Sequence, residues 1–340
     1  MRKFACCLLL SIALFVCQAQ SLRDTLKVEN LVFEGAGIRG IAYCGALMEL
    51  DERGILEHVK RVAGTSSGAI TASLLSVGYT PQEIFDVIGN TDFAKFNDGR
   101  MGLAGGAFRL RKHMGWYKGN EFLHWLEGLI AVKTTSSDIT FRQLYQLAKA
   151  SPQYKELTVA ATCLNHQTSL YFSAETFPDM RIVDAVRASM AIPLYYEPLI
   201  VDRQGRVISQ DDMLPEHFLC VDGGFTANFI VSYYDTKNAD GSVNYAPTLG
   251  LRLDSDAQIL NDTAARDLAF HDITDTRDFI GAFYYIIKET MNRQLLTQAD
   301  WERTVSISDC AVPPKVKRLS NHEKDVLINS GRKGTRTYFK

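Results

Sequence analysis

Short apolar runs alternate with helical patterns in the first part of the chain. Residues 31–33 and 59–63 are compact apolar runs, each closed by a glycine. Residues 41–50 and 67–77 follow them, with apolar side chains at helical spacing. Strands and helices that alternate in this rhythm predict parallel strands with crossover helices. We therefore expect an α/β fold with a central, mainly parallel sheet flanked by helices.

The same periodicities predict further elements along the chain. Strands are expected at 157–164, 169–174, 218–221 and 248–253, and helices at 121–132, 141–150, 182–190 and 279–294. Thr80 and Glu83 have the spacing of a capping box, which predicts another helix start. We expect 248–253 to be the last core strand and 311–340 to be a polar tail. The predicted domain spans 31–235, and 236–340 is a mostly helical C-terminal extension that completes the sheet and packs on the core.

Residues 97–119 differ in composition from their surroundings. They contain six glycines and a series of basic residues, so we predict a flexible basic loop. Arg109, Arg111 and Lys112 alternate with apolar Phe108 and Leu110, a mixture that suits a membrane interface. Two interpretations stay open: a mobile flap that meets a lipid surface near the site, and a solvated loop whose aromatic residues pack on the domain.

The N-terminus has the pattern of a targeting signal. Arg2 and Lys3 give a basic start, 4–16 are almost wholly apolar, and small residues precede a cut after Ala19. This predicts a signal peptide over 1–19 and an exported protein, whether periplasmic, outer-membrane-associated or secreted. An uncleaved anchor and lipoprotein processing at Cys17 are the alternatives.

Composition and charge narrow the class of protein. The chain has 340 residues, of which 46% are hydrophobic and 22% charged, as in ordinary globular proteins. Its formal net charge is −2, whereas nucleic-acid-binding proteins usually carry an excess of basic residues, so we expect no nucleic-acid partner.

The cysteines after the leader are widely spaced and predict neither a disulfide framework nor a zinc site. They are Cys44, Cys163, Cys220 and Cys310. We expect no metal and no organic cofactor.

A glycine-rich turn follows the first predicted strand. Residues 35–40 read Gly-Ala-Gly-Ile-Arg-Gly, which matches the spacing of a dinucleotide-binding turn. That function also requires an acidic residue at the end of the next strand, and 61–65 contain none. A structural turn, or a turn with another function, is the better interpretation.

The second predicted strand ends in Gly-Thr-Ser-Ser-Gly at 64–68. In a nucleophile elbow a strained turn exposes the central serine, and small residues two positions away on either side allow the close passage of the chain. Ser66 is therefore the candidate nucleophile. Because the carboxyl ends of parallel strands share one edge of the sheet, the glycine turn presents backbone N–H groups beside Ser66 as an oxyanion hole.

A serine nucleophile needs a base, and Asp222 is the better candidate. It ends a predicted buried strand and precedes Gly223 and Gly224, although Asp-Gly-Gly is also a plain turn signal. None of the histidines has a convincing position at a strand end. They are His58, His113, His124, His166, His217, His271 and His322.

Taken together, these motifs resemble the signatures of the patatin-like phospholipases. The glycine turn, the Ser66 elbow and the Asp222 turn occur in that family's order, and 187–193 resembles its Ala-Ser-x-x-Ile-Pro segment. The resemblance covers about 31–235. It implies Ser66 as nucleophile and Asp222 as base. It also implies an oxyanion hole on Gly35, Ala36 and Gly37, supported by Arg39, Gly40, Gly64, Gly68, Gly223 and Gly224. Ala36 replaces a glycine that many members carry, but an alanine keeps the N–H group.

The resemblance implies a lipid acyl hydrolase of the phospholipase A or lysophospholipase type. Its substrate is a lipid or phospholipid, with peripheral contact to a membrane surface. Two alternatives stay open. One is a Ser-His-Asp esterase, for which Ser66, Asp222 and His271 stand in a fitting chain order. The other is a catalytically weak lipid-binding or partner-binding module.

Overall fold

The computed structural model describes residues 27–340 with internal gaps. The residues not described within this range are 100, 265, 266, 271, 276–278, 280, 281, 283, 284, 287, 288, 291, 294 and 315. The predicted leader with Cys17, and also His271, therefore lie outside the described residues. Half of the residues in the helix predicted at 279–294 also lie outside the described residues. Within the described part of the chain, no helix has the length and apolar character needed to cross a membrane.

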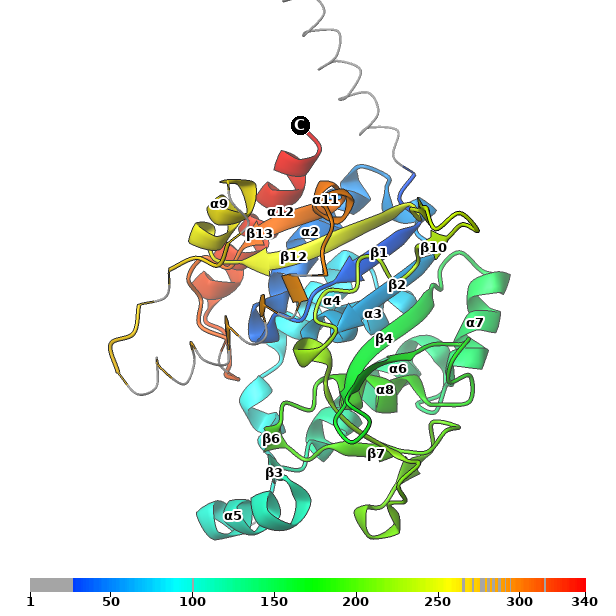
Figure 1. Cartoon of the computed structure of the whole chain (residues 1–340), viewed down its shortest axis with the longest axis vertical. Coiled ribbons are helices and arrows are strands. Elements are labelled where there is room, and N and C mark those ends of the chain that lie inside the picture. The colour runs from blue at the N-terminus through cyan, green and yellow to red at the C-terminus, as the bar shows by residue number, and fades with distance from the viewer. Residues whose placement is uncertain are drawn as a thin grey trace, which may run out of the picture.

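Nine strands of the described chain form one mixed sheet (Figure 1). They are β1 (Asn30–Phe33), β2 (Arg61–Thr65), β4 (Glu156–Cys163), β5 (Thr168–Phe172), β7 (Leu199–Val201), β8 (Val207–Ile208), β9 (Phe218–Asp222), β12 (Thr248–Asp254) and β13 (Thr304–Ser308). Strands β13, β12, β1, β2 and β4 are neighbours in this order and run parallel. Strands β5, β9, β7 and β8 add antiparallel pairs. The predicted α/β class with a mainly parallel centre is confirmed.

Strand β4 brings two strand ends together. Strand β5 pairs with residues 159–163 along one edge of β4, so β2 and β9 share its other edge. Strand β2 ends with Thr65 opposite Ala160, and β9 runs in the opposite direction and ends with Asp222 opposite Ala161. The carboxyl ends of β2 and β9 therefore meet head to head, a geometry that parallel pairing alone does not produce.

Helices cover one face of the sheet, and the chain after β9 covers part of the other. The described helices are α2 (Ala42–Glu52), α3 (Ser67–Ser76), α4 (Pro81–Asn90), α5 (Gly102–His113), α6 (Asn120–Thr134), α7 (Phe141–Ala150), α8 (Ile182–Ser189), α9 (Asp256–Ala264), α11 (Gln298–Glu302) and α12 (Asn321–Tyr338). Among them, α9 and α11 lie on the second face, where they contact the polar side chains of β12 and their partners, and α5 packs against β3 (Gly115–Tyr117). Side chains alternate along β1, so Leu31 and Phe33 join the core under the helices. Val32 instead packs in the second cluster, with Phe229 and Val231. The capping box predicted at Thr80 is present.

Residues 97–119 are not the predicted flexible loop. They contain α5 and the short strand β3 (Gly115–Tyr117), which pairs with β6 (Leu194–Tyr196). Gly106 serves close packing, because a Cβ there would lie 2.3 Å from the Trp116 ring. Arg109 is buried and donates to the Trp116 carbonyl at 2.9 Å, so it is not one of the surface cations that the sequence suggested.

The C-terminal part contributes more regular structure than its polar composition indicates. The predicted strand at 248–253 is β12, but it is not the last core strand, because β13 follows and buries Val305 and Ile307. The predicted polar tail contains α12, which packs against α2. The backbones approach closely there, since a Cβ on Gly45 or Gly331 would lie 2.0 Å from a carbonyl oxygen of the other helix.

Cys44, Cys163 and Cys220 are buried, as the apolar context of each predicts. Burial raises the pKa of all three thiols, so these side chains behave as small hydrophobic groups.

Candidate active site

Ser66 lies on a strained turn between β2 and α3. Its φ of 52° and ψ of −121° are an unusual backbone conformation for a residue with a side chain. Gly64 and Gly68, two positions away on either side, must be glycines because other parts of the backbone approach them too closely for a side chain. A Cβ on Gly64 would lie 2.4 Å from Gly68, and a Cβ on Gly68 would lie 2.3 Å from the Phe33 carbonyl oxygen. The local sequence therefore fits a nucleophile elbow.

The Ser66 hydroxyl donates to Asp222. The distance from Ser66 Oγ to Asp222 Oδ2 is 2.6 Å, and both side chains are buried. The other carboxylate oxygen, Oδ1, accepts from the Gly224 N–H at 2.7 Å. Gly223 has no room for a side chain, because a Cβ would lie 2.6 Å from the Ala160 carbonyl oxygen. This turn fixes the carboxylate so that one oxygen faces the serine.

Of the three N–H groups predicted for an oxyanion hole, two have partners within the protein. Gly35 donates to the Asn228 carbonyl at 3.2 Å, and Ala36 donates to Ser67 Oγ at 2.9 Å. Gly37 has a φ of +59° and lines the pocket beside Ser66. No acceptor for its N–H occurs among the residues that the structure describes. The geometry therefore leaves Gly37 as the available donor of the three.

Arg39 and Gly40 support the turn. Arg39 does not point into the pocket, since it donates to the Ala36 carbonyl at 3.2 Å and forms an ion pair with Asp309 at 2.7 Å. Gly40 leaves room for Ser67, whose Oγ would lie 2.9 Å from a Cβ on residue 40.

The Ala-Ser-x-x-Ile-Pro segment joins the two halves of the site. The Ser189 hydroxyl accepts from the Ser66 N–H at 2.8 Å and donates to the Ala160 carbonyl at 2.6 Å. The Ala191 carbonyl accepts from the Asp222 N–H at 2.9 Å. The sequence motif marks this segment but gives Ser189 no predicted role, because its hydrogen bonds join distant strands.

A pocket of about 630 Å³, counted with its open mouth, lies next to Ser66. Its walls are almost entirely apolar and come from several elements. They include Ile38, Ile41, Ile70, Ile88, Phe93, Phe122, Met190, Ile192, Tyr196 and Val316. Such a lining excludes water and has the chemistry to accept a hydrocarbon chain. Val316 shows that the C-terminal part also forms the pocket wall.

None of the six histidines in the described part of the chain lines this pocket. His113 contacts Gln210, and His124 contacts Glu127. His322 is exposed on α12. His271, the member of the alternative triad, lies outside the described residues, so the geometry supports a serine-aspartate pair without testing that triad.

Comparison with known proteins places this chain in a family. An uncharacterized protein of Bacillus subtilis (strain 168), YqhO, is 26% identical over 324 residues, which are 91% of this chain and 97% of that protein. The probable lipid hydrolase 463L of Invertebrate iridescent virus 6 is 29% identical over 220 residues. That match covers 62% of this chain and 66% of the viral protein.

The crystal structure of VipD from Legionella pneumophila has the same fold. It matches with a TM-score of 0.56 at 16% identity, over 92% of this chain and 67% of that one. The family model of patatin-like phospholipases matches residues 31–234, which include the glycine turn, the Ser66 elbow and the Asp222 turn. The chain therefore belongs to the patatin-like phospholipase family.

Proposed function

We propose that this protein is a lipid acyl hydrolase that cleaves fatty-acyl esters through Ser66 and Asp222. The hydrogen bond of 2.6 Å between Ser66 Oγ and Asp222 Oδ2 is the observation that carries this proposal. It pairs a nucleophile on a strained elbow with a carboxylate that can take its proton directly. The apolar pocket beside the pair supports a fatty-acyl group as the part of the substrate that binds there.

The reaction follows from the positions of these groups. Asp222 Oδ2 takes the hydroxyl proton as Ser66 Oγ bonds to the ester carbonyl carbon, and the carbonyl oxygen becomes an oxyanion. The Gly37 N–H stabilises that charge, and the proton passes from Asp222 to the leaving alcohol or lysolipid as the ester bond breaks. Water then gives a proton to Asp222 and attacks the acyl-enzyme. When that bond breaks, Ser66 recovers its proton and the fatty acid leaves.

Helix α5 is the part of the surface that we assign to the lipid interface. Met101, directly before this helix, is 80% exposed, and Leu103 and Phe108 on the helix are 81% and 61% exposed, which are high values for apolar side chains. Arg111 and Lys112 are exposed on the same helix and can meet anionic headgroups. Strand β3 follows α5 and pairs with β6, which carries the pocket residue Tyr196. The helix is thus connected to the pocket wall.

The test combines covalent labelling with product analysis. A fluorophosphonate probe should label Ser66 in the wild type, and a mixed lipid panel should yield free fatty acids by mass spectrometry. Ser66→Ala and Asp222→Asn should each fold and lose nearly all hydrolysis, while His271→Ala should retain it. Loss with His271→Ala would support the Ser-His-Asp alternative instead. A folded wild type without labelling at Ser66 would support a binding module.

Export remains part of the proposal and rests on the N-terminal pattern alone. The basic start, the apolar run and the small residues Cys17 and Ala19, three before and one before the cut, predict cleavage after residue 19. The mass of the mature protein, purified from its own membrane and soluble fractions, distinguishes this cut from lipid attachment at Cys17 and from an uncleaved leader.

A further inference from the structure

The side chain of Asn292 connects two points of the chain that follows β9. Its Oδ1 accepts from the Asn228 N–H at 2.6 Å, and its Nδ2 donates to the Gly224 carbonyl at 3.1 Å. Asn292 is only 5% exposed. It lies outside residues 31–234, the part of the chain that the family model matches.

Both of these points also hold a part of the active site. The Gly224 N–H donates to Asp222 Oδ1 at 2.7 Å and so fixes the carboxylate. The Asn228 carbonyl accepts from the Gly35 N–H at 3.2 Å, and its Nδ2 donates to Glu34 Oε1 at 3.0 Å. The Asn292 amide therefore contacts the turn of the base directly, and it reaches the glycine turn through one intermediate residue, Asn228.

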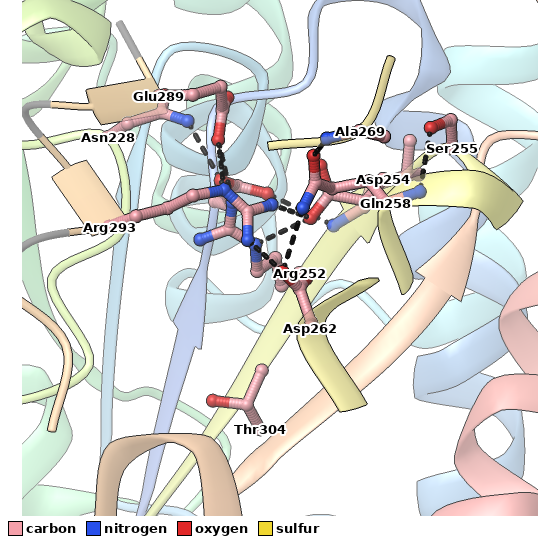
Figure 2. A network of polar contacts seen from close by, with 12 residues as sticks. Asn228, Arg252, Asp254, Ser255, Gln258, Asp262, Ala269, Glu289, Arg293 and Thr304 are labelled. Carbon is pink, nitrogen blue, oxygen red and sulfur yellow. Dashed lines mark hydrogen bonds and ion pairs between the residues drawn. The ribbon is translucent and has the colours of Figure 1, made fainter. Parts of the chain in front are cut away.

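Residues next to Asn292 in the chain belong to a buried network of charges (Figure 2). Arg293, the next residue, pairs with Asp254 at 2.9 Å and also with Asp262. Glu289, three residues before Asn292, pairs with Arg252 at 2.8 Å. Arg252 and Asp254 belong to β12, so the network attaches this part of the chain to the sheet. Breaking one partner of a buried pair is costly, which makes this attachment firm.

We infer that Asn292 is a positioning residue for the active site, supplied by the C-terminal part of the chain. Its amide sets the separation between the Asp222 carboxylate and the glycine turn that carries the oxyanion donor. Preorganised groups lose effectiveness when they shift by a fraction of an ångström, so a remote side chain can control turnover without touching the substrate. This inference rests on the proposed function for its catalytic consequence, but the structural restraint itself can be measured separately.

Gln258 provides a matched control variant. It is also a fully buried amide of the C-terminal part, and it donates to Asp262 Oδ1 at 2.9 Å and to the Asp267 carbonyl at 2.8 Å. It also accepts from the Ala269 N–H at 2.7 Å. Gln258→Ala therefore removes comparable buried hydrogen bonds, one of them to Asp262 of the charge network, but no contact with the chain at 222–228. Since Asp262 keeps its ion pair with Arg293 in this variant, the comparison separates the Asn292 amide from its buried surroundings.

The experiment compares hydrogen-deuterium exchange in the full chain of wild type, Asn292→Ala and Gln258→Ala. Asn292→Ala should speed exchange in peptides covering 31–40 and 222–229, whereas Gln258→Ala should leave both at the wild-type rate. Asn292→Asp keeps the acceptor for Asn228 and loses the donor to Gly224, so it should speed exchange in 222–229 alone. It replaces the alanine variant if that one does not fold. The inference is overturned if the folded Asn292 variants exchange at the wild-type rate in both peptides. It is also overturned if Asn292→Ala and Gln258→Ala have equal effects.

Turnover of a soluble short-chain ester supplies the catalytic measurement. Asn292→Ala should lower kcat by roughly tenfold to a hundredfold, as expected for a small misplacement of reacting groups. KM should stay near the wild-type value, because Asn292 does not line the pocket. A raised KM with unchanged kcat contradicts a positioning role. A wild type that hydrolyses no ester refutes the proposed function, and the exchange result still decides whether Asn292 restrains the two turns.

Discussion

The backbone N–H of Ala36 donates to the hydroxyl of Ser67 at 2.9 Å. The residue that follows the proposed nucleophile therefore holds the glycine turn that faces it. Because this bond engages Ala36, and the Gly35 N–H is bonded to Asn228, Gly37 is the one donor of the three to which the proposed mechanism assigns the oxyanion. A hydrogen bond that shapes the turn thus also decides which of its amides can act on a substrate.

Gly37→Val should impair catalysis more than stability. Its φ of +59° is unfavourable for a side chain by about 1–2 kcal/mol, and a relaxed backbone turns the N–H away from the oxyanion. Losing one oxyanion donor lowers kcat by roughly a hundredfold to a thousandfold. Steady-state kinetics on a soluble ester and thermal unfolding of the same samples measure the two effects.

Gly54→Val is the control for the backbone penalty. Gly54 has a φ of +71°, and a Cβ there would meet no atom within 4 Å. It follows α2 and does not line the pocket. Its valine variant should unfold at a similarly lowered temperature while keeping the wild-type kcat. A Gly37→Val enzyme with normal kcat would show that the donor lies elsewhere.

Ser189→Ala should lower both kcat and stability. The substitution leaves the Ser66 N–H and the Ala160 carbonyl unpaired in a buried place, which costs about 1–3 kcal/mol in the free energy of unfolding. It also frees the elbow, so the reaction with a fluorophosphonate should slow. Ser73→Ala is the matched control, since Ser73 is equally buried and donates only to the Ile70 carbonyl in α3. Equal labelling rates in the two variants would contradict a role for Ser189.

Local motifs made the central residues predictable from the sequence. Ser66 and the glycines around it are specified by a strained turn whose steric demands act within a few residues, and the structure shows those demands at Gly64 and Gly68. Asp222 was predictable as a residue that ends a strand. What brings it to Ser66 is the antiparallel pairing of β9 with β4, which no local pattern encodes.

The remaining features depend on contacts between distant segments. Asn292 is one polar residue in an ordinary helical pattern, and only the bonds to Gly224 and Asn228 give it a role. The prediction of a flexible loop at 97–119 was wrong for a different reason. Its glycines indicate flexibility by composition, yet Gly106 allows the close packing of the Trp116 ring on α5. A glycine needed for packing and one needed for flexibility look the same in a single sequence.

The exposed face of α5 should matter only for substrate in a membrane. The substitutions Leu103→Ser and Phe108→Ser remove two exposed apolar side chains. Each loses roughly 1.5–3 kcal/mol of the free energy gained when the side chain is buried in lipid, so activity on anionic vesicles should fall at least tenfold. Activity on a soluble short-chain ester should not change. Val132→Ser is the control, because Val132 is 73% exposed on α6 and should affect neither substrate. Equal losses on both substrates would remove α5 from the lipid interface.

The attachment of α12 should depend on pH through Glu323. Hydrogen bonds from Lys317 and from the Ser320 N–H and hydroxyl lower the pKa of this carboxyl to about 2, below its ordinary value of 4.5. A carboxyl with a lowered folded-state pKa stabilises the fold fully above about pH 4.5, and this contribution disappears as pH falls towards 2. Glu323→Gln should therefore unfold at a lower temperature than wild type at pH 6, with the difference vanishing near pH 2. Asp325→Asn removes an exposed carboxylate from the same helix and should unfold at the wild-type temperature at pH 6. A difference for Glu323→Gln that persists at pH 2 would mean that the ionised capping residue is not what stabilises the start of α12.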